Sequence, residues 1–288
     1  IFTSFMLYLN MWGGFMEFIN LSSTAATLLI TLYSRAAMSR SKMILEDKKA
    51  EEIISLAGYD EKKLKVSLKL QALLTLRAYL MDQYTKDFIK RYNGNCNIIQ
   101  LGCGLDSRYS RIKEERIKWY DLDLYGTMLM RKKYYKNSLN YKMITSNVCN
   151  LSWIDEIDCL SKPTLIIGEG LFMYLNKEEN ELVLNELCKK FTNCEIIMDV
   201  FNTHSVRFSR FAPSLRRVNA NLKFGFNNHK VLEQMCPLEH IETMYYYDCD
   251  KINDLPIFTK LRFNFRRKTG LFKKVQRIEV YKVKKSGK

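Results

Sequence analysis

Residues 97–108, NIIQLGCGLDSR, predict a buried strand that turns sharply into a helix. The run 97–101 is short and mostly apolar, as in a strand covered on both faces of a sheet. Gly102 and Gly104 follow at once, and glycine lets a backbone turn tightly and pass close to a ligand. An ordinary strand–helix turn has the same pattern, so its meaning depends on the rest of the sequence.

The segments that follow repeat this alternation of strand and helix. Four more apolar runs predict strands, and Asn176 to Glu179 has the form of a capping box that opens the helix before the last of them. Residues 242–248 and 274–283 are expected to be further strands, whereas 257–270 fits either a strand or a helix. Residues 21–92 are expected to be helical. The four runs are 117–123, 140–144, 164–169 and 195–200. Together they predict an α/β fold with a mostly parallel sheet.

The composition is that of a globular chain with an uneven charge. The chain has 288 residues, 47% of them hydrophobic, and a formal net charge of +15. This hydrophobic content excludes a disordered or collagen-like polymer. Residues 260–288 hold twelve Lys or Arg and a single acid, Glu279. The charge distribution therefore argues against a uniformly basic nucleic-acid coat and leaves a basic C-terminal edge.

The cysteines and the N-terminal stretch bear on compartment. Eight cysteines and three histidines show no zinc-finger or C-x-x-C spacing, so we expect no metal site and reduced thiols in the cytoplasm. Residues 1–34 contain one charge, Glu17, but polar residues interrupt every window of about twenty. We expect this stretch to cover the core or a homodimer contact, and not to span a membrane.

Acids follow two of the predicted strands. Asp123 lies 21 positions beyond Gly102, the distance at which an acid can bind the hydroxyls of a ribose, although a solvated loop acid is the alternative. Glu169 ends an apolar strand and needs a positive partner, either on a ligand or from Arg77 or Arg35. The third glycine of the dinucleotide fingerprint is absent, which disfavours NAD and FAD.

With these motifs the chain resembles the leucine carboxyl methyltransferase family of class I S-adenosylmethionine-dependent methyltransferases. That family includes O-methyltransferases of polyketide-type metabolites. The resemblance implies a Rossmann-like fold with a mostly parallel seven-stranded sheet, helices on both faces and an N-terminal helical extension. It is carried by Thr24 to Ala26, Arg35 and Ala36, Arg77 ahead of Asp82, IIQLGCGLDSRYSRI (98–112), WYDLDLYGTMLMRKKYY (119–135) and GEGLFMYL (168–175).

The resemblance also implies S-adenosyl-L-methionine as cofactor and assigns roles to residues at the strand ends. Arg77, together with Arg35, would grip the methionine carboxylate, a task suited to a bidentate guanidinium. Asp123 would hold the ribose diol. Glu169 would face the ammonium or sulfonium, and Tyr174 would help to close that wall. The implied cofactor-binding residues are Arg35, Arg77, Gly102, Gly104, Asp106, Asp123, Leu124, Asn147, Val148, Glu169 and Gly170.

One position of the sequence departs from the family pattern. Asn147 stands where the family usually has an aspartate that accepts the adenine amino group. Its amide oxygen still accepts a hydrogen bond, without the charge.

The implied organisation is a helical cover over 1–92, contributing to the pocket, and a Rossmann-like core over 93–288, in one structural unit.

The acceptor is expected to be a carboxylate, or a hydroxyl, of a small molecule or a chain terminus, methylated by in-line transfer. A carboxylate is ionised at neutral pH and needs no general base, whereas a hydroxyl needs one. Tyr174 and His204 are the candidates for a catalytic role, although a surface or loop histidine is the favoured interpretation of His204. Cations after the fifth strand could bind an acidic acceptor or simply be solvated: Arg207, Arg210, Arg216, Arg217 and Lys223.

Two other functions stay open at this point. An RNA-modifying methyltransferase would use LRFNFRRKTGLFKK (261–274) for stacking and phosphate contacts, although nucleic acid is the less expected partner. A cofactor-binding protein with weakened catalysis is the other alternative, because of Asn147.

Overall fold

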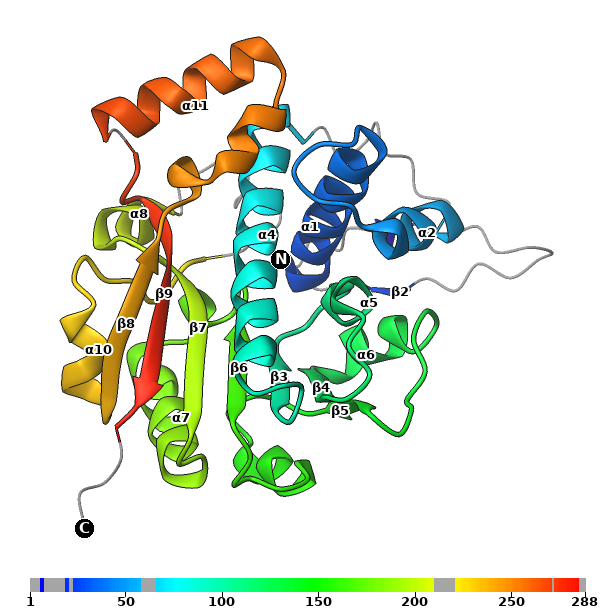
Figure 1. Cartoon of the computed structure of the whole chain (residues 1–288), viewed down its shortest axis with the longest axis vertical. Coiled ribbons are helices and arrows are strands. Elements are labelled where there is room, and N and C mark those ends of the chain that lie inside the picture. The colour runs from blue at the N-terminus through cyan, green and yellow to red at the C-terminus, as the bar shows by residue number, and fades with distance from the viewer. Residues whose placement is uncertain are drawn as a thin grey trace.

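A seven-stranded sheet lies at the centre of the molecule (Figure 1). The computed structural model describes residues 6–7, 19–20, 23–57, 66–209, 221–270 and 272–284. The sheet order is β5-β4-β3-β6-β7-β9-β8, in which the first five strands are parallel and the last two are antiparallel to their neighbours. The strands are β3 (Asn97–Leu101), β4 (Lys118–Asp123), β5 (Tyr141–Thr145), β6 (Thr164–Gly168), β7 (Cys194–Phe201), β8 (Leu238–Met244) and β9 (Gln276–Val283).

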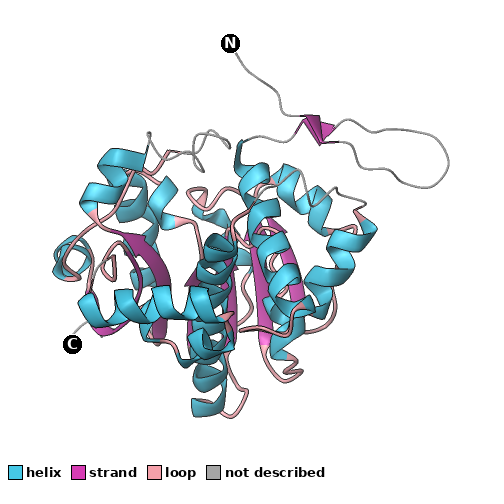
Figure 2. Cartoon of the chain, turned by 90° about the horizontal axis from the view of Figure 1, so that it is seen from above, coloured by secondary structure: helices cyan, strands magenta, loops and turns pink. Residues whose placement is uncertain are grey.

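The parallel strands lie between two layers of helices (Figure 2). Every residue of β3 and β6 is buried, and successive side chains of a strand enter opposite cores, as Ile98 and Ile99 do. Burial on both faces explains why these segments are almost continuously apolar and do not alternate. The five strands predicted between residues 97 and 200 and the mostly parallel sheet are confirmed.

The basic strand β9 enters the sheet between β7 and β8. Gln276 lies opposite Phe201, so β9 begins at the edge where the parallel strands end. Arg277 is buried in β9 and forms an ion pair with Glu279 of the same strand. The strand predicted at 274–283 is confirmed, and its one buried arginine is neutralised inside the sheet.

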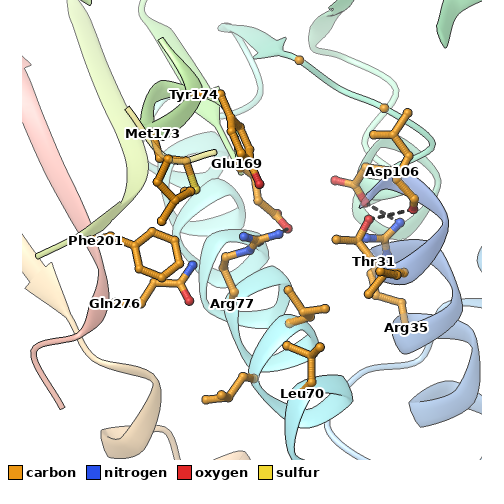
Figure 3. A pocket seen from close by; sticks show the side chains of 18 of the residues that line it. Thr31, Arg35, Leu70, Arg77, Asp106, Glu169, Met173, Tyr174, Phe201 and Gln276 are labelled. Carbon is orange, nitrogen blue, oxygen red and sulfur yellow. Dashed lines mark hydrogen bonds and ion pairs between the residues drawn. The ribbon is translucent and has the colours of Figure 1, made fainter. Parts of the chain in front are cut away.

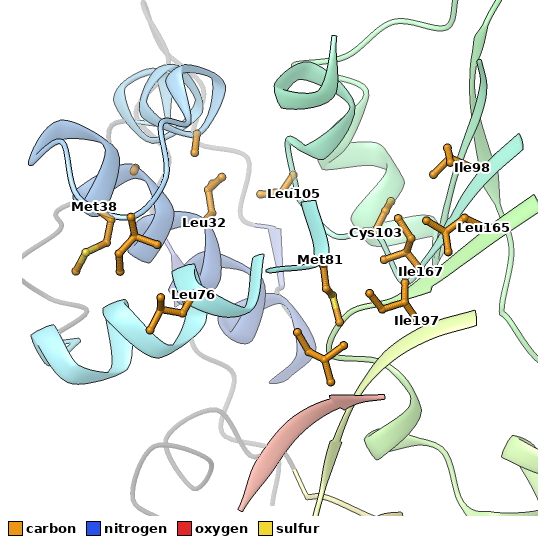
Figure 4. Close-up of a cluster of buried hydrophobic side chains, with 14 of the residues drawn as sticks. Leu32, Met38, Leu76, Met81, Ile98, Cys103, Leu105, Leu165, Ile167 and Ile197 are labelled. Atoms are coloured by element: carbon orange, nitrogen blue, oxygen red, sulfur yellow. The ribbon is translucent and has the colours of Figure 1, made fainter. Parts of the chain in front are cut away.

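In the described part of the N-terminal region, three helices pack together, the longest lying across one face of the sheet and the other two beside it (Figure 1). They are α1 (Ser23–Arg40), α2 (Lys48–Leu56) and α4 (Leu68–Arg91), and they confirm the helical prediction for this region. The buried side chains of Leu32, Leu76 and Met81 continue into those of Ile167 and Ile197 on the sheet (Figure 4). The N-terminal helices and the sheet therefore share one hydrophobic core.

The opposite face is covered mainly by α7 (Lys177–Lys190). This helix begins with the predicted capping box, in which the Asn176 side chain accepts from the backbone of Glu179 and Glu179 accepts from the backbone of Asn176. The remaining elements are α5 (Arg108–Ile112), α6 (Tyr125–Arg131), α8 (Thr203–Phe208), α10 (Lys230–Met235), α11 (Ile257–Thr269), the 3-10 helices η1 (Leu151–Glu156), η2 (Phe172–Tyr174), η4 (Tyr246–Asp248) and η5 (Asp250–Asp254), and the paired two-residue strands β1 (Met6–Leu7) and β2 (Ile19–Asn20).

The structure corrects the bounds of one predicted C-terminal strand and shows that a second C-terminal segment is a helix. The strand predicted at 242–248 begins earlier, at Leu238, and ends at Met244, because the chain then turns through η4 to bury Tyr246 and Tyr247. The segment 257–270, which fitted either structure, is the helix α11, and Gly270 ends it with a left-handed φ of 66°.

Some expectations fall where the structure gives no description. The side chains of residues 1–27, whose role as apolar cover was predicted, lie outside the described part, as do Arg210, Arg216 and Arg217. Within the described ranges, no helix is both long and apolar enough to cross a membrane.

Candidate active site

A cavity of about 500 Å³ opens where the parallel strands end (Figure 3). Its walls come from α1, α4, the turn after β3, the segment after β6, the end of β7, α8 and the start of β9. These elements meet at the point where the chain order reverses between β3 and β6, which is where parallel α/β sheets bind their ligands.

The turn after β3 depends on its glycines. Gly102 and Gly104 have φ of 62° and 55°, in the left-handed region that side chains with a Cβ disfavour. A Cβ on Gly104 would also lie 2.4 Å from Cδ2 of Leu28 in α1. The two glycines therefore let the backbone form one wall of the cavity.

Replacing Gly104 by alanine is expected to destabilise the fold by about 1 kcal/mol and to weaken binding of S-adenosylmethionine. The strain comes from the positive φ, and the new methyl group would displace Leu28 from the cavity wall. Thermal unfolding and calorimetric titration of the cofactor measure the two effects. Gly126→Ala is the matched control, because nothing lies within 4 Å of a Cβ at this position in α6. Equal behaviour of the two variants would refute the role given to Gly104.

Asp123 ends β4 beside this turn. One of its carboxylate oxygens accepts from the Gly104 N–H at 2.7 Å, and the other accepts from the Leu124 N–H at 2.7 Å. The side chain is buried, and burial raises the pKa of its carboxyl above the usual value. Both oxygens retain acceptor capacity. A buried acid held by backbone amides, with no arginine partner among the described ion pairs, fits a ligand that donates hydroxyl groups.

A second set of charges lies on the other side of the turn. Nη2 of Arg77 lies 2.9 Å from Glu169, and its Nη1 lies 2.8 Å from Asp199 on β7. Arg108, which is fully buried, binds the other oxygen of Glu169 at 2.5 Å and Asp82 of α4 at 2.6 Å. The predicted alternative, an ion pair of Glu169 with Arg77, is therefore confirmed.

The same charges continue toward α1 and α2. Nε of Arg35 lies 3.0 Å from Asp47, the residue that caps α2, and Nη2 lies 3.5 Å from Asp106. Arg111 bridges both acids, at 2.8 Å and 2.9 Å, and reaches Asp82 at 2.7 Å. We call the whole set the ionic network: Arg35, Arg77, Arg108 and Arg111 with Asp47, Asp82, Asp106, Glu169 and Asp199.

The ionic network is a single charge system with a net charge of −1. Burial alone would raise the pKa of Glu169, but Arg77 and Arg108 outweigh it and hold that pKa below the usual value. In the same way the arginines around Asp106 and Asp47 hold both pKa values low despite burial. These three acids are thus held in the ionised form next to the cavity, and the ion pairs of the network join α1, α2 and α4 to the sheet.

The structure brings most of the predicted residues to the cavity but not all. Arg35, Arg77, the Gly102 to Asp106 turn, Glu169 and Gly170 line it, and so does Tyr174, whose pKa is raised by burial. Other predicted residues do not line it: Leu124, which is exposed, Val148, which is buried, and Asp123, Asn147 and His204.

Asn147 and His204, two of the residues outside the cavity lining, both lie exposed to solvent. Asn147 is exposed, and its amide oxygen accepts from the Cys149 N–H at 2.9 Å. His204 is an exposed residue of α8, which fits the alternative of a surface histidine.

Sequence reasoning missed five members of the ionic network. Asp199 lies inside the apolar run of β7, and a carboxylate in such a run requires a partner just as Glu169 does, so this signal was present. The other four are Asp47, Asp82, Arg108 and Arg111. Asp82, Arg108 and Arg111 stand in segments that carry the family resemblance, but no local pattern shows their charge partners, because most of these come from distant segments.

The remaining wall of the cavity is largely apolar. It is formed by side chains of α4, η2, β7, α8 and the start of β9, and its uncharged polar groups are those of Tyr174, Ser205, Ser209 and Gln276. Nε2 of Gln276 donates to Asp199 at 2.9 Å. The apolar members are Leu70, Leu73, Leu74, Met173, Phe201, Phe208, Leu222 and Val275. The cavity thus has a charged end at the β3 turn and an apolar end below α8.

Known proteins resemble the chain in sequence and in fold. It is 28% identical over 223 residues to the tetracenomycin polyketide synthesis O-methyltransferase TcmP of Streptomyces glaucescens, covering 77% of this chain and 82% of the relative. It is 26% identical over 250 residues to the S-adenosyl-L-methionine-dependent methyltransferase dpfgK of Gibberella zeae, covering 79% and 84%.

The fold is also that of a solved structure, a DUF574-family protein of Streptomyces avermitilis, with a TM-score of 0.54 at 9% identity over 83% of this chain and 90% of that one. The family model for leucine carboxyl methyltransferase matches residues 26–188, which is more than half of the chain. The chain is therefore a methyltransferase and belongs to the leucine carboxyl methyltransferase family.

Proposed function

We propose that this methyltransferase acts on an anionic oxygen, a carboxylate in particular, of a predominantly apolar small molecule. S-adenosyl-L-methionine is the methyl donor, as the family implies, and it supplies an electrophilic methyl group on a positively charged sulfur. The acceptor is inferred from the apolar end of the cavity, which is the observation that carries the proposal.

The charged end of the cavity suits the cofactor. Asp123 is not part of the cavity lining but lies directly behind Gly104, which is, and it would accept from the two ribose hydroxyls in charge-assisted bonds, the stronger kind. Three of the five N–H donors of Arg77 engage Glu169 and Asp199, which leaves two for the methionine carboxylate. The ionic network has a net charge of −1, and the cofactor carries a net charge of +1, so the two are complementary.

The apolar end holds no described group suited to act as a general base. Its ionisable neighbours Arg77 and Glu169 are committed to ion pairs, and burial raises the pKa of Tyr174. A neutral hydroxyl acceptor would need such a base. A carboxylate needs none. Its reaction with a sulfonium removes both charges, and an apolar site that excludes water favours that step.

The residues of this chain mainly position the reactants. Gly104 and Asp123 would fix the ribose, while Arg77 and Glu169 would fix the amino-acid end, so that the sulfur faces the apolar wall around Met173. Alignment of nucleophile, methyl and sulfur within a water-poor cavity can supply much of the acceleration. The polyketide role in the name of one relative agrees with an apolar acceptor.

The test compares a planar aromatic carboxylic acid with its matched primary alcohol as acceptors. Methyl ester formation, followed by mass spectrometry, is expected for the acid, with a rate at least about a hundredfold above that of the alcohol, the typical contribution of a missing general base. The rate should stay constant with pH above the pKa of the acid itself, because no enzyme base titrates. His204→Ala should retain full activity.

The contrary outcome is equally defined. Methylation of the alcohol with a rate that rises with pH, and its loss in His204→Ala, would replace the carboxylate by a hydroxyl as acceptor. Methyl transfer to RNA, with neither small molecule used, would refute the proposal in favour of the RNA-modifying alternative.

A further inference from the structure

An exposed apolar stripe runs along α11. Four side chains of this helix are more than half exposed: Ile257 at 59%, Phe258 at 80%, Leu261 at 56% and Phe265 at 61%. With about 100° of rotation per residue, they fall within an arc of about 100° on one face of the helix. Phe272, just beyond the helix, is 51% exposed as well. A contiguous apolar surface on a solvent-exposed helix face marks an interaction site.

The opposite face of α11 fixes the helix to the body. Phe263 is buried and its ring lies 5.3 Å from that of Tyr247, while Nη1 of Arg266 donates to the Tyr247 hydroxyl at 3.0 Å. Gly270 ends the helix. The stripe is therefore presented outward on an ordered helix, at the top of the molecule in Figure 1.

Positive charge borders the stripe on both sides. By helical rotation, Arg262 lies on one side, Lys260 and Arg267 lie on the other, and Lys268 falls at the C-terminal end of the stripe. The whole segment 256–274 contains seven Lys or Arg and no acid. The charge reaches neighbouring helices, since burial, Arg266 and Arg262 lower the pKa of Lys69 in α4.

We propose that α11 docks on the surface of an anionic lipid bilayer. A helix with large apolar side chains on one face and basic residues along its borders lies in the plane of the bilayer, with the apolar face at the boundary of headgroups and acyl chains. Each basic residue near an anionic surface adds electrostatic attraction. The helix is too short to span the bilayer, so the association is peripheral and reversible.

Other occupants fit the surface less well. RNA would use the basic residues and could stack on Phe258 or Phe265, but Ile257 and Leu261 offer nothing to phosphates or bases. A second copy of the chain would bring two acid-free basic segments face to face across a two-fold axis, which is repulsive. A bilayer takes the aliphatic, aromatic and basic side chains together.

The place of α11 in the fold gives the docking a direction. The segment after α11 enters β9 at Gln276, which lines the cavity and lies at the edge where the parallel strands end. Docking through α11 would thus hold this edge of the molecule, and not its far end, towards the lipid. The proposal concerns the surface of α11 alone and holds whichever acceptor the enzyme uses.

Flotation of the full chain with lipid vesicles tests the proposal. The chain is expected to bind phosphatidylcholine vesicles that contain phosphatidylserine. Binding should be at least about tenfold weaker without the anionic lipid and should fall steeply with added salt. Leu261→Ser and Phe258→Ser should each weaken binding severalfold. The matched control is Leu182→Ser on α7, where the leucine is 49% exposed and lies away from the stripe.

A charge variant separates the two contributions. Arg267→Gln with Lys268→Gln should weaken binding and flatten its salt dependence, whereas Lys132→Gln with Lys133→Gln, a basic pair at the end of α6, should not. Unchanged thermal unfolding shows that each variant is folded. Absence of binding to anionic vesicles, or equal binding by Leu261→Ser and the parent, would overturn the proposal. The proposal would also be overturned if the parent chain bound RNA or itself but not vesicles, and if the same variants lost that binding.

Discussion

Arg108→Met is expected to destabilise the fold by about 3–5 kcal/mol, the usual cost of removing one partner from a buried set of charges. Arg108 is fully buried and binds Asp82 at 2.6 Å and Glu169 at 2.5 Å. Methionine fills a similar volume but removes one arginine from each of these buried carboxylates, so that Asp82 keeps only Arg111 and Glu169 keeps only Arg77 as an ion-pair partner. In thermal or urea unfolding, a chain of this size should show a Tm lower by roughly 2–4 °C per kcal/mol.

A matched arginine on the surface provides the control. Arg116 forms an ion pair with Glu114 at 2.9 Å, but its side chain is 68% exposed. Solvent screens exposed pairs of this kind and leaves them little net stabilisation, so Arg116→Met should unfold almost as the parent does. If Arg108→Met cost no more than Arg116→Met, the ionic network would not be a structural element of this fold.

The pH dependence of the same protein checks the network independently. Neighbouring arginines hold the pKa values of Glu169, Asp106 and Asp47 below their usual values against the effect of burial. Carboxyls with lowered pKa values in the folded state stabilise it fully above their unfolded pKa values, about 4, and lose that effect as the pH falls below them. Acid unfolding should therefore begin below about pH 4 in the parent and at higher pH in Arg108→Met.

Asp123→Ala is expected to weaken binding of S-adenosylhomocysteine by about ten- to a hundredfold, the range for loss of charge-assisted hydrogen bonds. The affinity of Asp123→Asn should lie between those of the parent and Asp123→Ala, because its amide keeps an acceptor for the Gly104 N–H but loses the charge. Calorimetric titration measures the affinity, and thermal unfolding separates it from a collapse of the turn. Asp87→Asn, at an exposed position of α4, is the control.

The binding should also depend on acidity with a known sign. Burial raises the pKa of Asp123, so affinity should be constant near neutral pH and should weaken as the pH falls through that raised value, where the carboxyl takes up a proton. Cofactor affinity equal to that of the parent in Asp123→Ala would show that the ribose lies elsewhere.

The secondary structure could be predicted because its causes are local. The apolar run at 97–101 and the capping box at Asn176 depend on neighbours within a few residues, and the structure confirms both. The prediction was wrong at the boundaries of β8, and it left α11 undecided. Both segments owe their structure to packing, since Tyr246 and Tyr247 turn inward and Phe263 anchors the helix.

The candidate site was predicted as far as its residues lie at strand ends. The turn at Gly102 and the acids Asp123 and Glu169 follow apolar runs, so topology alone brings them to one edge. The charge partners were harder to foresee. Arg77 and Asp199 lie 122 positions apart, and Arg108 and Glu169 lie 61 apart.

The sequence by itself therefore determined the family, the positions of most strands and the residues at their carboxyl ends, because periodicity, glycine turns and caps act over a few positions. Only the tertiary structure decided that nine charged side chains form one buried network, that the cavity has a charged and an apolar end, and that α11 carries its apolar stripe outward. Those features arise where segments distant in the sequence meet, and the energies of burial and charge pairing that fix them depend on contacts that no local pattern records.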